Sequence, residues 1–392
     1  MKNNLYLAYR YLIFNKIRSL VLISCITIIA VLPLTLEILL NESERQLALR
    51  AELSPLLLGA KGSALDLVMN SLYFSDEVPQ TITMAATEQV MDSELAMPIP
   101  LYIRFQARSF PIVGTTLDYF DFRKLEMEQG KIFTSLGQCV IGSDVADKLG
   151  LNPDDYIVSS PENLFDIAGM YPLKMKISGV LASSNSADDL AVFVDIKTAW
   201  VIHGLGHGHK DVTQTTDSSV ILKKDKSNVT ANAKLIQYTE ITEENIDSFH
   251  LHGDSADFPL TAVLAIPYDE KSSTILQGRY LKKDTPYQIV QPKEVIDTLM
   301  ANIFKIRNVL DAVIVLVGAA TLLALVLVFS LSLRLREREI AVIFKLGCSR
   351  ATTARLLGAE IFIIILVSAI VCLCFMSLVV QFDQELVRSL FL

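Results

Sequence analysis

All five histidines of this 392-residue chain lie between positions 203 and 252, in two short clusters. The segment HGLGHGH contains His203, His207 and His209, and the segment HLHGD contains His250 and His252. Imidazole binds zinc, copper and nickel, and glycines between ligands let a loop wrap around an ion. The spacing matches no known zinc signature, and glycine-rich histidine tracts also occur as solvated loops. A solvated loop is therefore the favoured interpretation, and the alternative is a zinc site that senses or hands on the metal.

The rest of the sequence contains no catalytic motif. The segment GAKGS at residues 59–63 lacks the spacing of a nucleotide-binding phosphate loop, and no G-x-S-x-G or H-E-x-x-H motif is present. Cys139 lies in an apolar segment and is predicted to belong to the core. We expect no catalytic residue and no cofactor of the chain's own, so ATP hydrolysis would be performed by a separate subunit.

The composition indicates a membrane protein with an acidic middle segment. Hydrophobic residues make up 51% of the chain, and the mean hydropathy is +0.41. Residues 1–18 contain four basic and no acidic side chains, and residues 334–358 contain six basic and two acidic ones. Because the net charge of the chain is −8, the remaining residues carry a net charge of −16. Lys and Arg near membrane spans stay on the cytoplasmic side, so both basic segments are predicted to be cytoplasmic. Neither resembles a nucleic-acid-binding surface.

Three segments are apolar and long enough to cross a bilayer as helices: residues 19–40, 309–333 and 359–380. A cleaved signal peptide is the alternative for the first, but its apolar core is too long and no cleavage site follows it. On the cytoplasmic side we expect an amphipathic helix on the lipid surface at residues 1–18 and a loop at 334–358. On the other side we expect a domain at residues 41–291, a stalk helix at 292–308 that leads into the second span, and a tail at 381–392.

The large extracytoplasmic domain is predicted to be α+β. Alternating apolar segments predict strands at residues 102–107, 111–116, 138–141, 173–181, 191–195, 219–223 and 259–266, the first two forming a hairpin around Arg108 and Ser109. Helices are predicted at residues 144–149, with Ser143 as N-cap and Gly150 at the C-terminal end, at 195–203 and at 229–239. Residues 183–189 and 211–218 are predicted to be exposed loops.

Two segments carry a resemblance to a known family. Residues 338–342 (REIAV) followed by 346–350 (LGCSR) resemble a signature of the MacB/FtsX-like family of ABC transporter permeases, with Cys348 where alanine is usual. Residues 140–151 (VIGSDVADKLGL) resemble a strand-then-helix element of the same family. The resemblance implies a MacB-like periplasmic domain and a location in the bacterial inner membrane. It also implies that the chain pairs with a second permease copy or a paralogue and that a cytoplasmic ABC ATPase binds the ATP. The family usually has a fourth span, and three are predicted here.

The basic loop itself has the pattern of a coupling helix. Residues 339–350 make about three helical turns, with apolar Ile340, Ile343 and Phe344 beside the basic Arg338 and Arg350. The other residues assigned to this contact are Glu339, which could pair with a basic residue of the ATPase, Gly347, which would end the helix, and Ser349, which would cap the next one. The alternative is an ordinary cytoplasmic loop, which needs the arginines but not the ordered helix pattern.

Two classes of function remain open from the sequence. In the first, the chain is a permease subunit that moves a substrate or extracts it from the outer leaflet. In the second, it transports nothing and transmits motion to an extracytoplasmic partner, such as a cell-wall hydrolase, a binding protein or a membrane-fusion protein, with a link to zinc. A membrane-anchored metalloenzyme is a weaker third interpretation.

Overall fold

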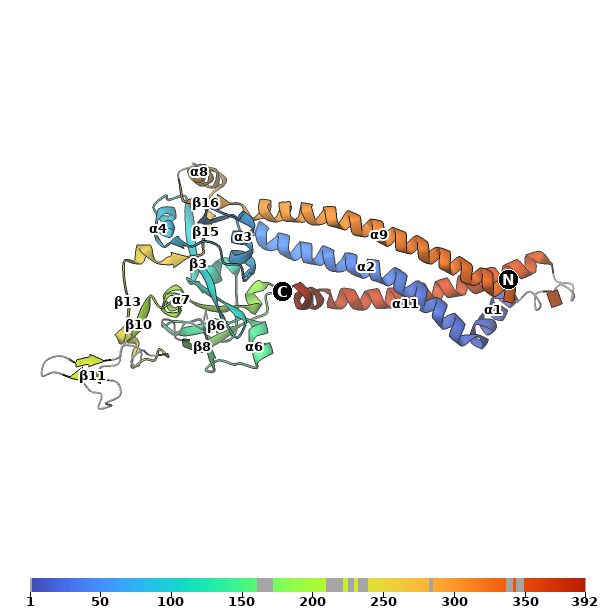
Figure 1. The fold of residues 1–392 in the computed structure, drawn as a ribbon, viewed down its shortest axis with the longest axis horizontal. Helices are drawn as coiled ribbons and strands as arrows, with labels where there is room; N and C mark the ends of the chain where they lie inside the picture. Colours follow the sequence, from blue (N-terminus) through green and yellow to red (C-terminus); the bar gives the residue numbers. More distant parts are fainter. Residues whose placement is uncertain are drawn as a thin grey trace. The chain divides into compact units, whose positions relative to one another are not determined.

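The computed structural model describes residues 2–160, 172–208, 221–224, 229–231, 239–281, 285–335, 341–342 and 349–391. They form two compact units (Figure 1). The first unit consists of Met1–Gln46 and Met300–Leu392, and the second is Leu47–Leu299.

The first unit is built from four helices in its described part: α1 (Lys2–Phe14), α2 (Lys16–Glu52), α9 (Pro292–Leu335) and α11 (Arg350–Phe391). Helix α1 packs against α11. The Ser368 hydroxyl donates a hydrogen bond to the carbonyl of Ile23 at 3.4 Å, so α11 also contacts α2. Within the described residues, two helices are long and apolar enough to cross a membrane, Lys16–Glu52 and Ala354–Gln381. They contain the spans expected at residues 19–40 and 359–380.

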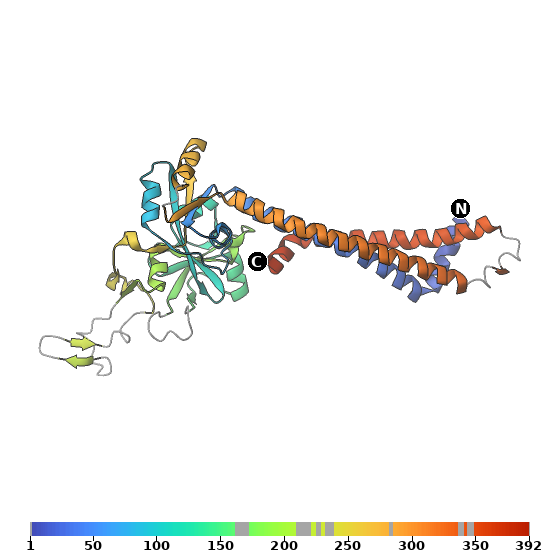
Figure 2. The same cartoon turned by 45° about the horizontal axis from the view of Figure 1, so that its top comes forward.

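Helix α9 covers the residues that were expected to form the stalk and the second span, 292–308 and 309–333. It runs without interruption from Pro292 to Leu335, and both views draw it as one continuous helix (Figures 1 and 2). Proline is well tolerated at the first position of a helix because the N–H it lacks would have no partner there.

The second unit is α+β and centres on a mixed ten-stranded sheet. The strand order is β16-β1-β15-β3-β4-β9-β6-β8-β5, with β7 also paired to β8. The pairs β4–β9 and β6–β8 are parallel, and the others are antiparallel. The strands are β1 (Leu56–Ala60), β3 (Ala96–Ala107), β4 (Phe110–Thr115), β5 (Met127–Gly130), β6 (Gln138–Ile141), β7 (Tyr156–Val158), β8 (Lys174–Leu181), β9 (Val192–Asp195), β15 (Ala262–Pro267) and β16 (Tyr287–Val290).

Short elements flank this sheet. The helices are α3 (Ala64–Tyr73), α4 (Ala85–Met91), α5 (Asp118–Arg123), α6 (Ser143–Leu149), α7 (Ile196–Ile202), α8 (Glu270–Tyr280) and the 3-10 helices η1 (Ala187–Leu190), η3 (Ile246–Ser248) and η4 (Ser255–Asp257). Three two-stranded ribbons pair β2 (Ile82–Thr83) with β14 (Pro259–Leu260), β10 (Gly206–Gly208) with β13 (Phe249–Leu251), and β11 (Ile221–Lys224) with β12 (Val229–Ala231).

The hairpin expected between residues 102 and 116 is formed by β3 and β4. Its two turn residues, Arg108 and Ser109, have φ angles of 49° and 72°. Two consecutive left-handed residues are the mark of a type I′ turn, whose twist matches that of the flanking strands. The expected strand at residues 138–141 is β6, and Cys139 within it is fully buried, as the apolar pattern predicted.

Helix α7 illustrates how local signals position an element on the sheet. The Asp195 carboxylate caps it by accepting a hydrogen bond from the Lys197 N–H at 2.9 Å. Trp200 on this helix packs against Phe258, and its indole N–H donates to the Pro259 carbonyl at 2.9 Å. Strand β10 follows α7 directly and contacts it (Figure 1).

Three expectations about elements were wrong in detail. The helix expected at residues 229–239 begins instead as strand β12, because Val229 and Thr230 are β-branched and pair with β11; residues 232–238 lie outside the described part. The strand expected at residues 259–266 is interrupted at Thr261, where β14 ends and β15 has not yet begun. Ser143 is the first residue of α6 and not its cap; the cap position is Gly142, without a side-chain bond, whereas Gly150 ends the helix with φ +64° as expected.

Candidate functional site

Most of the predicted ATPase contact lies outside the described residues. This applies to six of its eight residues: Arg338, Glu339, Ile340, Ile343, Phe344 and Gly347. The remaining two, Ser349 and Arg350, stand at the start of α11, whose first helical residue is Arg350. The role of all eight stays a prediction from the sequence.

The histidines separate into different environments. His207, His250 and His252 come together, with candidate ligand atoms all within 4.8 Å of one another. His203 does not join them: its Nδ1 is 2.9 Å from the Tyr102 hydroxyl, and its ring packs against Phe105. His209 lies outside the described residues.

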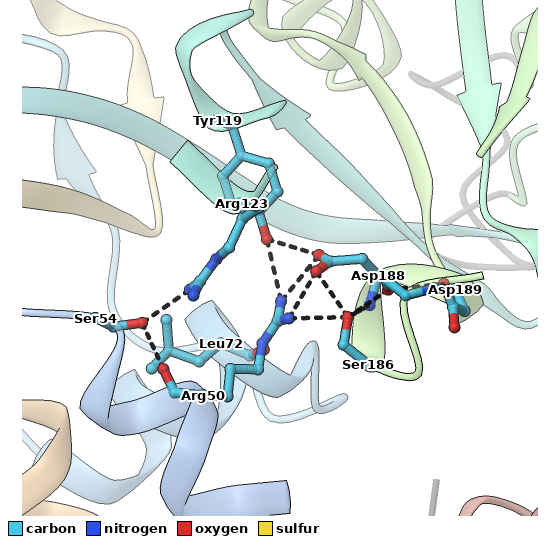
Figure 3. Close-up of polar contacts among 9 residues, drawn as sticks. Arg50, Ser54, Leu72, Tyr119, Arg123, Ser186, Asp188 and Asp189 are labelled. Carbon is cyan, nitrogen blue, oxygen red and sulfur yellow. Dashed lines mark hydrogen bonds and ion pairs between the residues drawn. The ribbon is translucent and has the colours of Figure 1, made fainter. Parts of the chain in front are cut away.

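A buried polar cluster that the sequence did not suggest lies within the second unit, around the C-terminal end of α2. Arg50, in the last turn of α2, forms a bidentate ion pair with Asp188 in η1, with Nη–Oδ distances of 2.6 and 2.9 Å (Figure 3). The Arg50 side chain is only 8% exposed and that of Asp188 only 2%. Bidentate geometry and exclusion from water make such charge-assisted bonds strong and directional.

The remaining donors and acceptors of this ion pair are also used. The Tyr119 hydroxyl donates to Asp188 at 2.8 Å and accepts from Arg50 at 3.1 Å. Ser186 donates to the second Asp188 oxygen at 2.9 Å, and Arg50 Nε donates to the carbonyl of Leu72 (Figure 3). A buried charge is tolerable when it is paired and fully hydrogen-bonded, and this cluster meets both conditions.

Arg123 extends the cluster back to the end of α2. Its Nη2 donates to the Ser54 hydroxyl at 2.8 Å, and that hydroxyl donates to the Arg50 carbonyl at 2.8 Å (Figure 3). The guanidinium also lies over the Tyr119 ring, 5.8 Å from its centroid. The end of α2 is therefore bonded to α5 and η1 through several independent contacts.

The electrostatics follow from this geometry. Burial by itself would raise the pKa of Asp188, but the charge and hydrogen bonds of Arg50, with Arg123 nearby, hold that pKa below its ordinary value, at about 2. Burial and the neighbouring carboxylate of Asp188 raise the pKa of Tyr119 to about 12. Asp188 is thus a carboxylate and Tyr119 a neutral phenol at physiological pH, which is the state that the hydrogen bonds require.

The loop that carries Asp188 was expected to be exposed throughout, and this expectation was wrong at its end. Ser183 and Ser184 are exposed, but Asp188 and Asp189 are buried. Asp189 accepts hydrogen bonds from the Ser184 N–H and hydroxyl at 2.9 and 2.8 Å. Gly142 packs so closely on this segment that an added Cβ would lie 2.3 Å from the Asp189 carbonyl oxygen. A polar loop can be buried here because Arg50 and the loop's own serines bond both carboxylates.

One sequence signal could have identified Arg50. Small residues follow Arg50 one and four positions on, at Ala51 in α2 and at Ser54 just beyond it, a spacing that puts them on one helical face, and all three are buried. An arginine on the face of small, buried residues requires a carboxylate partner, although the sequence does not say which one. Pro55 then ends the helix, because its ring cannot continue the hydrogen-bond pattern.

Two of the long helices, α2 and α9, attach to neighbouring strands. Helix α2 leads through a short connection into β1, and β16 leads directly into α9; β1 and β16 pair antiparallel, with Leu57 opposite Val290. Lys293 at the start of α9 pairs with Glu52 at the end of α2 at 2.8 Å, an exposed contact worth little by itself. The end of α2 and the start of α9 therefore meet at one edge of the sheet.

Part of the second unit matches a known protein family. Residues 52–238 match the family described as "MacB-like periplasmic core domain". Among solved structures, the periplasmic region of MacB from Actinobacillus actinomycetemcomitans aligns at 12% identity and a TM-score of 0.35, covering 63% of this chain and 92% of that one. The extracellular domain of the noncanonic ABC-type transporter YknZ from Gram-positive bacteria aligns at 12% identity and a TM-score of 0.33, covering 60% and 98%. No curated protein matches the chain.

The family match begins at the last residue of α2 and covers most of the sheet. Residues 52–238 thus match a MacB-like periplasmic core domain of the kind found in ABC-transporter-type permeases, which agrees with the resemblance to the MacB/FtsX-like family seen in the sequence.

Proposed function

We propose that this chain is the permease subunit of an ABC transporter and that it hydrolyses no ATP itself. A separate cytoplasmic ATPase drives it, and the resulting motion of the membrane helices changes the conformation of the MacB-like domain so that a substrate is moved or extracted. The family supports the general class, because MacB-like domains belong to ABC-transporter-type permeases.

The observation that carries the mechanism is the attachment of helices α2 and α9 to one edge of the sheet. Strands β1 and β16 are hydrogen-bonded neighbours and continue into α2 and α9. Arg50 adds a buried, bidentate bond between α2 and η1. Because a packed interior deforms little, a displacement of either helix would be passed to the strands and to η1 rather than absorbed at the junction.

In this proposal the membrane part has three spans, at residues 19–40, 309–333 and 359–380, in the bacterial inner membrane. The N-terminus and residues 334–358 lie on the cytoplasmic side, where the excess of Lys and Arg supports their retention. Residues 339–350 dock on the ATPase as a coupling helix. A second copy of the chain or a paralogue completes the pathway, because three spans enclose too little protein to form one.

A second function is compatible with the same junction. The chain could transmit ATP-driven motion to an extracytoplasmic partner, such as a hydrolase or a membrane-fusion protein, without transporting a substrate. The cluster of His207, His250 and His252 favours a metal-linked form of this function.

Reconstitution with the ATPase tests the proposal. The chain, purified from membranes by a non-histidine tag, should bring its ATPase with it, and ATP turnover in lipid nanodiscs should be higher with the chain than for the ATPase alone. Failure of the two proteins to associate at any nucleotide state, or identical turnover with and without the chain, would contradict it.

A further inference from the structure

The ribbon of β10 and β13 places three histidines on one face. His207 is directly opposite His250 in the antiparallel register, flanked by the pairs Gly206–Leu251 and Gly208–Phe249. The pairing extends one residue further, because the His252 N–H donates to the Leu205 carbonyl at 3.0 Å. Directly opposed residues, and residues two apart on a strand, project from the same face of a ribbon. His207, His250 and His252 therefore share a face.

The opposite face of this ribbon is packed. Gly206 and Gly208 are buried, and Phe249 and Leu251 pack against the hydrophobic core. A Cβ added at Gly206 would lie 2.6 Å from Leu251 Cδ2, and one added at Gly208 would lie 2.6 Å from Phe249 Cδ2. The glycines leave room for the side chains of Leu251 and Phe249, which pack against the core on this face and fix the orientation of the ribbon. The histidine face is consequently directed outward, with His250 and His252 exposed and His207 half-buried.

The three rings are close enough to share one ion. Their candidate ligand atoms all lie within 4.8 Å of one another, and the ring centroids are 4.7 to 5.4 Å apart. Two nitrogens bound tetrahedrally to zinc at 2.0–2.1 Å are about 3.4 Å apart, so each pair needs to approach by at most about 1.4 Å. Imidazoles on an outward face cover such a distance by small side-chain rotations, without movement of the strands.

A second contact orients one of the ligands. His250 Nδ1 lies 3.0 Å from the Ser248 carbonyl oxygen. When Nδ1–H donates to that carbonyl, the lone pair is on Nε2, which is the arrangement found in histidines that bind metal. A loop that is merely solvated would not be expected to bring three imidazole rings together or to orient His250 in this way.

We propose that His207, His250 and His252 form a binding site for a divalent transition metal ion, Zn²⁺ first. Three imidazoles satisfy three of the four positions that tetrahedral zinc prefers, and the fourth is left for water or an incoming ligand. An exposed site with an open position exchanges its ion readily, so its role is to receive, sense or pass on the metal. This proposal does not depend on the proposed function, because it rests on the ribbon alone.

Titration of the full-length chain tests the site. The chain is purified without a histidine tag, freed of metal by chelation, placed in nanodiscs and titrated with Zn²⁺ by calorimetry and with Co²⁺ by visible absorption. We expect one ion per chain with a dissociation constant below about 100 μM and the intense d–d absorption of tetrahedral Co²⁺. His207→Ala, His250→Ala and His252→Ala should each weaken Zn²⁺ binding at least about 10-fold. Even the loss of a residue that only hydrogen-bonds to a metal ligand lowers metal affinity by about this factor.

The matched control is His203→Gln, which changes a histidine of the same segment that contacts Tyr102 instead of the other rings. It should bind Zn²⁺ as the wild type does, and the fluorescence of Trp200, the chain's single tryptophan, verifies the fold of each variant. Wild-type binding weaker than about 100 μM would overturn the proposal. So would unchanged affinity in the variant lacking all three histidines, or a loss in His203→Gln equal to that in His207→Ala.

Discussion

Arg50 and Asp188 stand 138 residues apart in the sequence and form a bidentate ion pair that is almost completely shielded from water. The pair joins the last turn of α2 to η1, which lies against Gly142 and the start of α6. The same ion pair thus attaches the end of α2 to the domain and holds η1 in its packed position.

Removing one partner of this pair should strongly destabilise the domain. Asp188→Asn leaves a buried arginine without its countercharge, and we expect a loss of about 3–5 kcal/mol in the free energy of unfolding. Denaturant unfolding followed by the emission of Trp200, which is buried in the same domain, measures this loss. Asp154→Asn removes an exposed partner of Lys176 and should change nothing measurable. In a double-mutant cycle of Arg50→Met and Asp188→Leu, the double variant should lose less stability than the sum of the two single variants; additive losses would contradict the pairing.

The ion pair should also give the domain a defined acid sensitivity. The pKa of Asp188 is lowered from 3.8 to about 2, so the unfolded chain takes up the proton at a higher pH than the folded one. The stabilisation is complete above about pH 4 and is lost as the pH falls toward 2, by about 2 kcal/mol in total. Unfolding of the wild type and of Asp188→Asn in detergent between pH 4 and 2 gives the difference. If the free energy of unfolding changes with pH equally in both proteins, the pKa of Asp188 is not lowered by folding.

Gly142 should be intolerant of any side chain. A Cβ there would lie 2.3 and 2.4 Å from the carbonyl oxygens of Asp189 and Asp188, and these are backbone atoms that cannot rotate away. We expect Gly142→Ala to destabilise the domain by about 1–3 kcal/mol, as overpacking does. Gly62→Ala is the matched control, because an added Cβ meets no atom within 4 Å, and its effect should stay within about 0.5 kcal/mol. Equal stability of the two variants would contradict the close packing of η1.

The predicted coupling segment should be sensitive at two positions. Glu339→Ala removes a charge proposed to pair with the ATPase, and Gly347→Leu removes the residue proposed to end the coupling helix with left-handed backbone. We expect each to weaken ATPase binding about 10-fold or more, or to abolish the stimulation of turnover, while membrane insertion is unchanged. Glu337→Ala, in the same loop but outside the family signature, is the control. If both variants bind the ATPase and stimulate its turnover as the wild type does, the segment is an ordinary cytoplasmic loop and not a coupling helix.

The parts of the fold that the sequence predicted are those specified locally. The β3–β4 hairpin, β6 and the Gly150 helix end depend on residues within a few positions of one another. The Arg50–Asp188 pair could not be predicted, because its loop is rich in serine and aspartate and resembles a solvated one until the partner from α2 is placed. Likewise, the convergence of His207 with His250 follows from the pairing of β10 with β13, not from their spacing. A helix was predicted in place of strand β12, because the local preference of these residues is weak and their pairing with β11 determines the conformation.

We propose that ATP-driven motion reaches the MacB-like domain through α2 and α9. Hydrogen–deuterium exchange of the nanodisc complex, compared with and without ATP, measures this directly. We expect altered exchange in three segments: the end of α2 with β1, β16 with the start of α9, and η1. The same complex carrying Glu339→Ala should show no such change. Unaltered exchange in all three segments, while the wild-type complex hydrolyses ATP, would contradict this route of coupling.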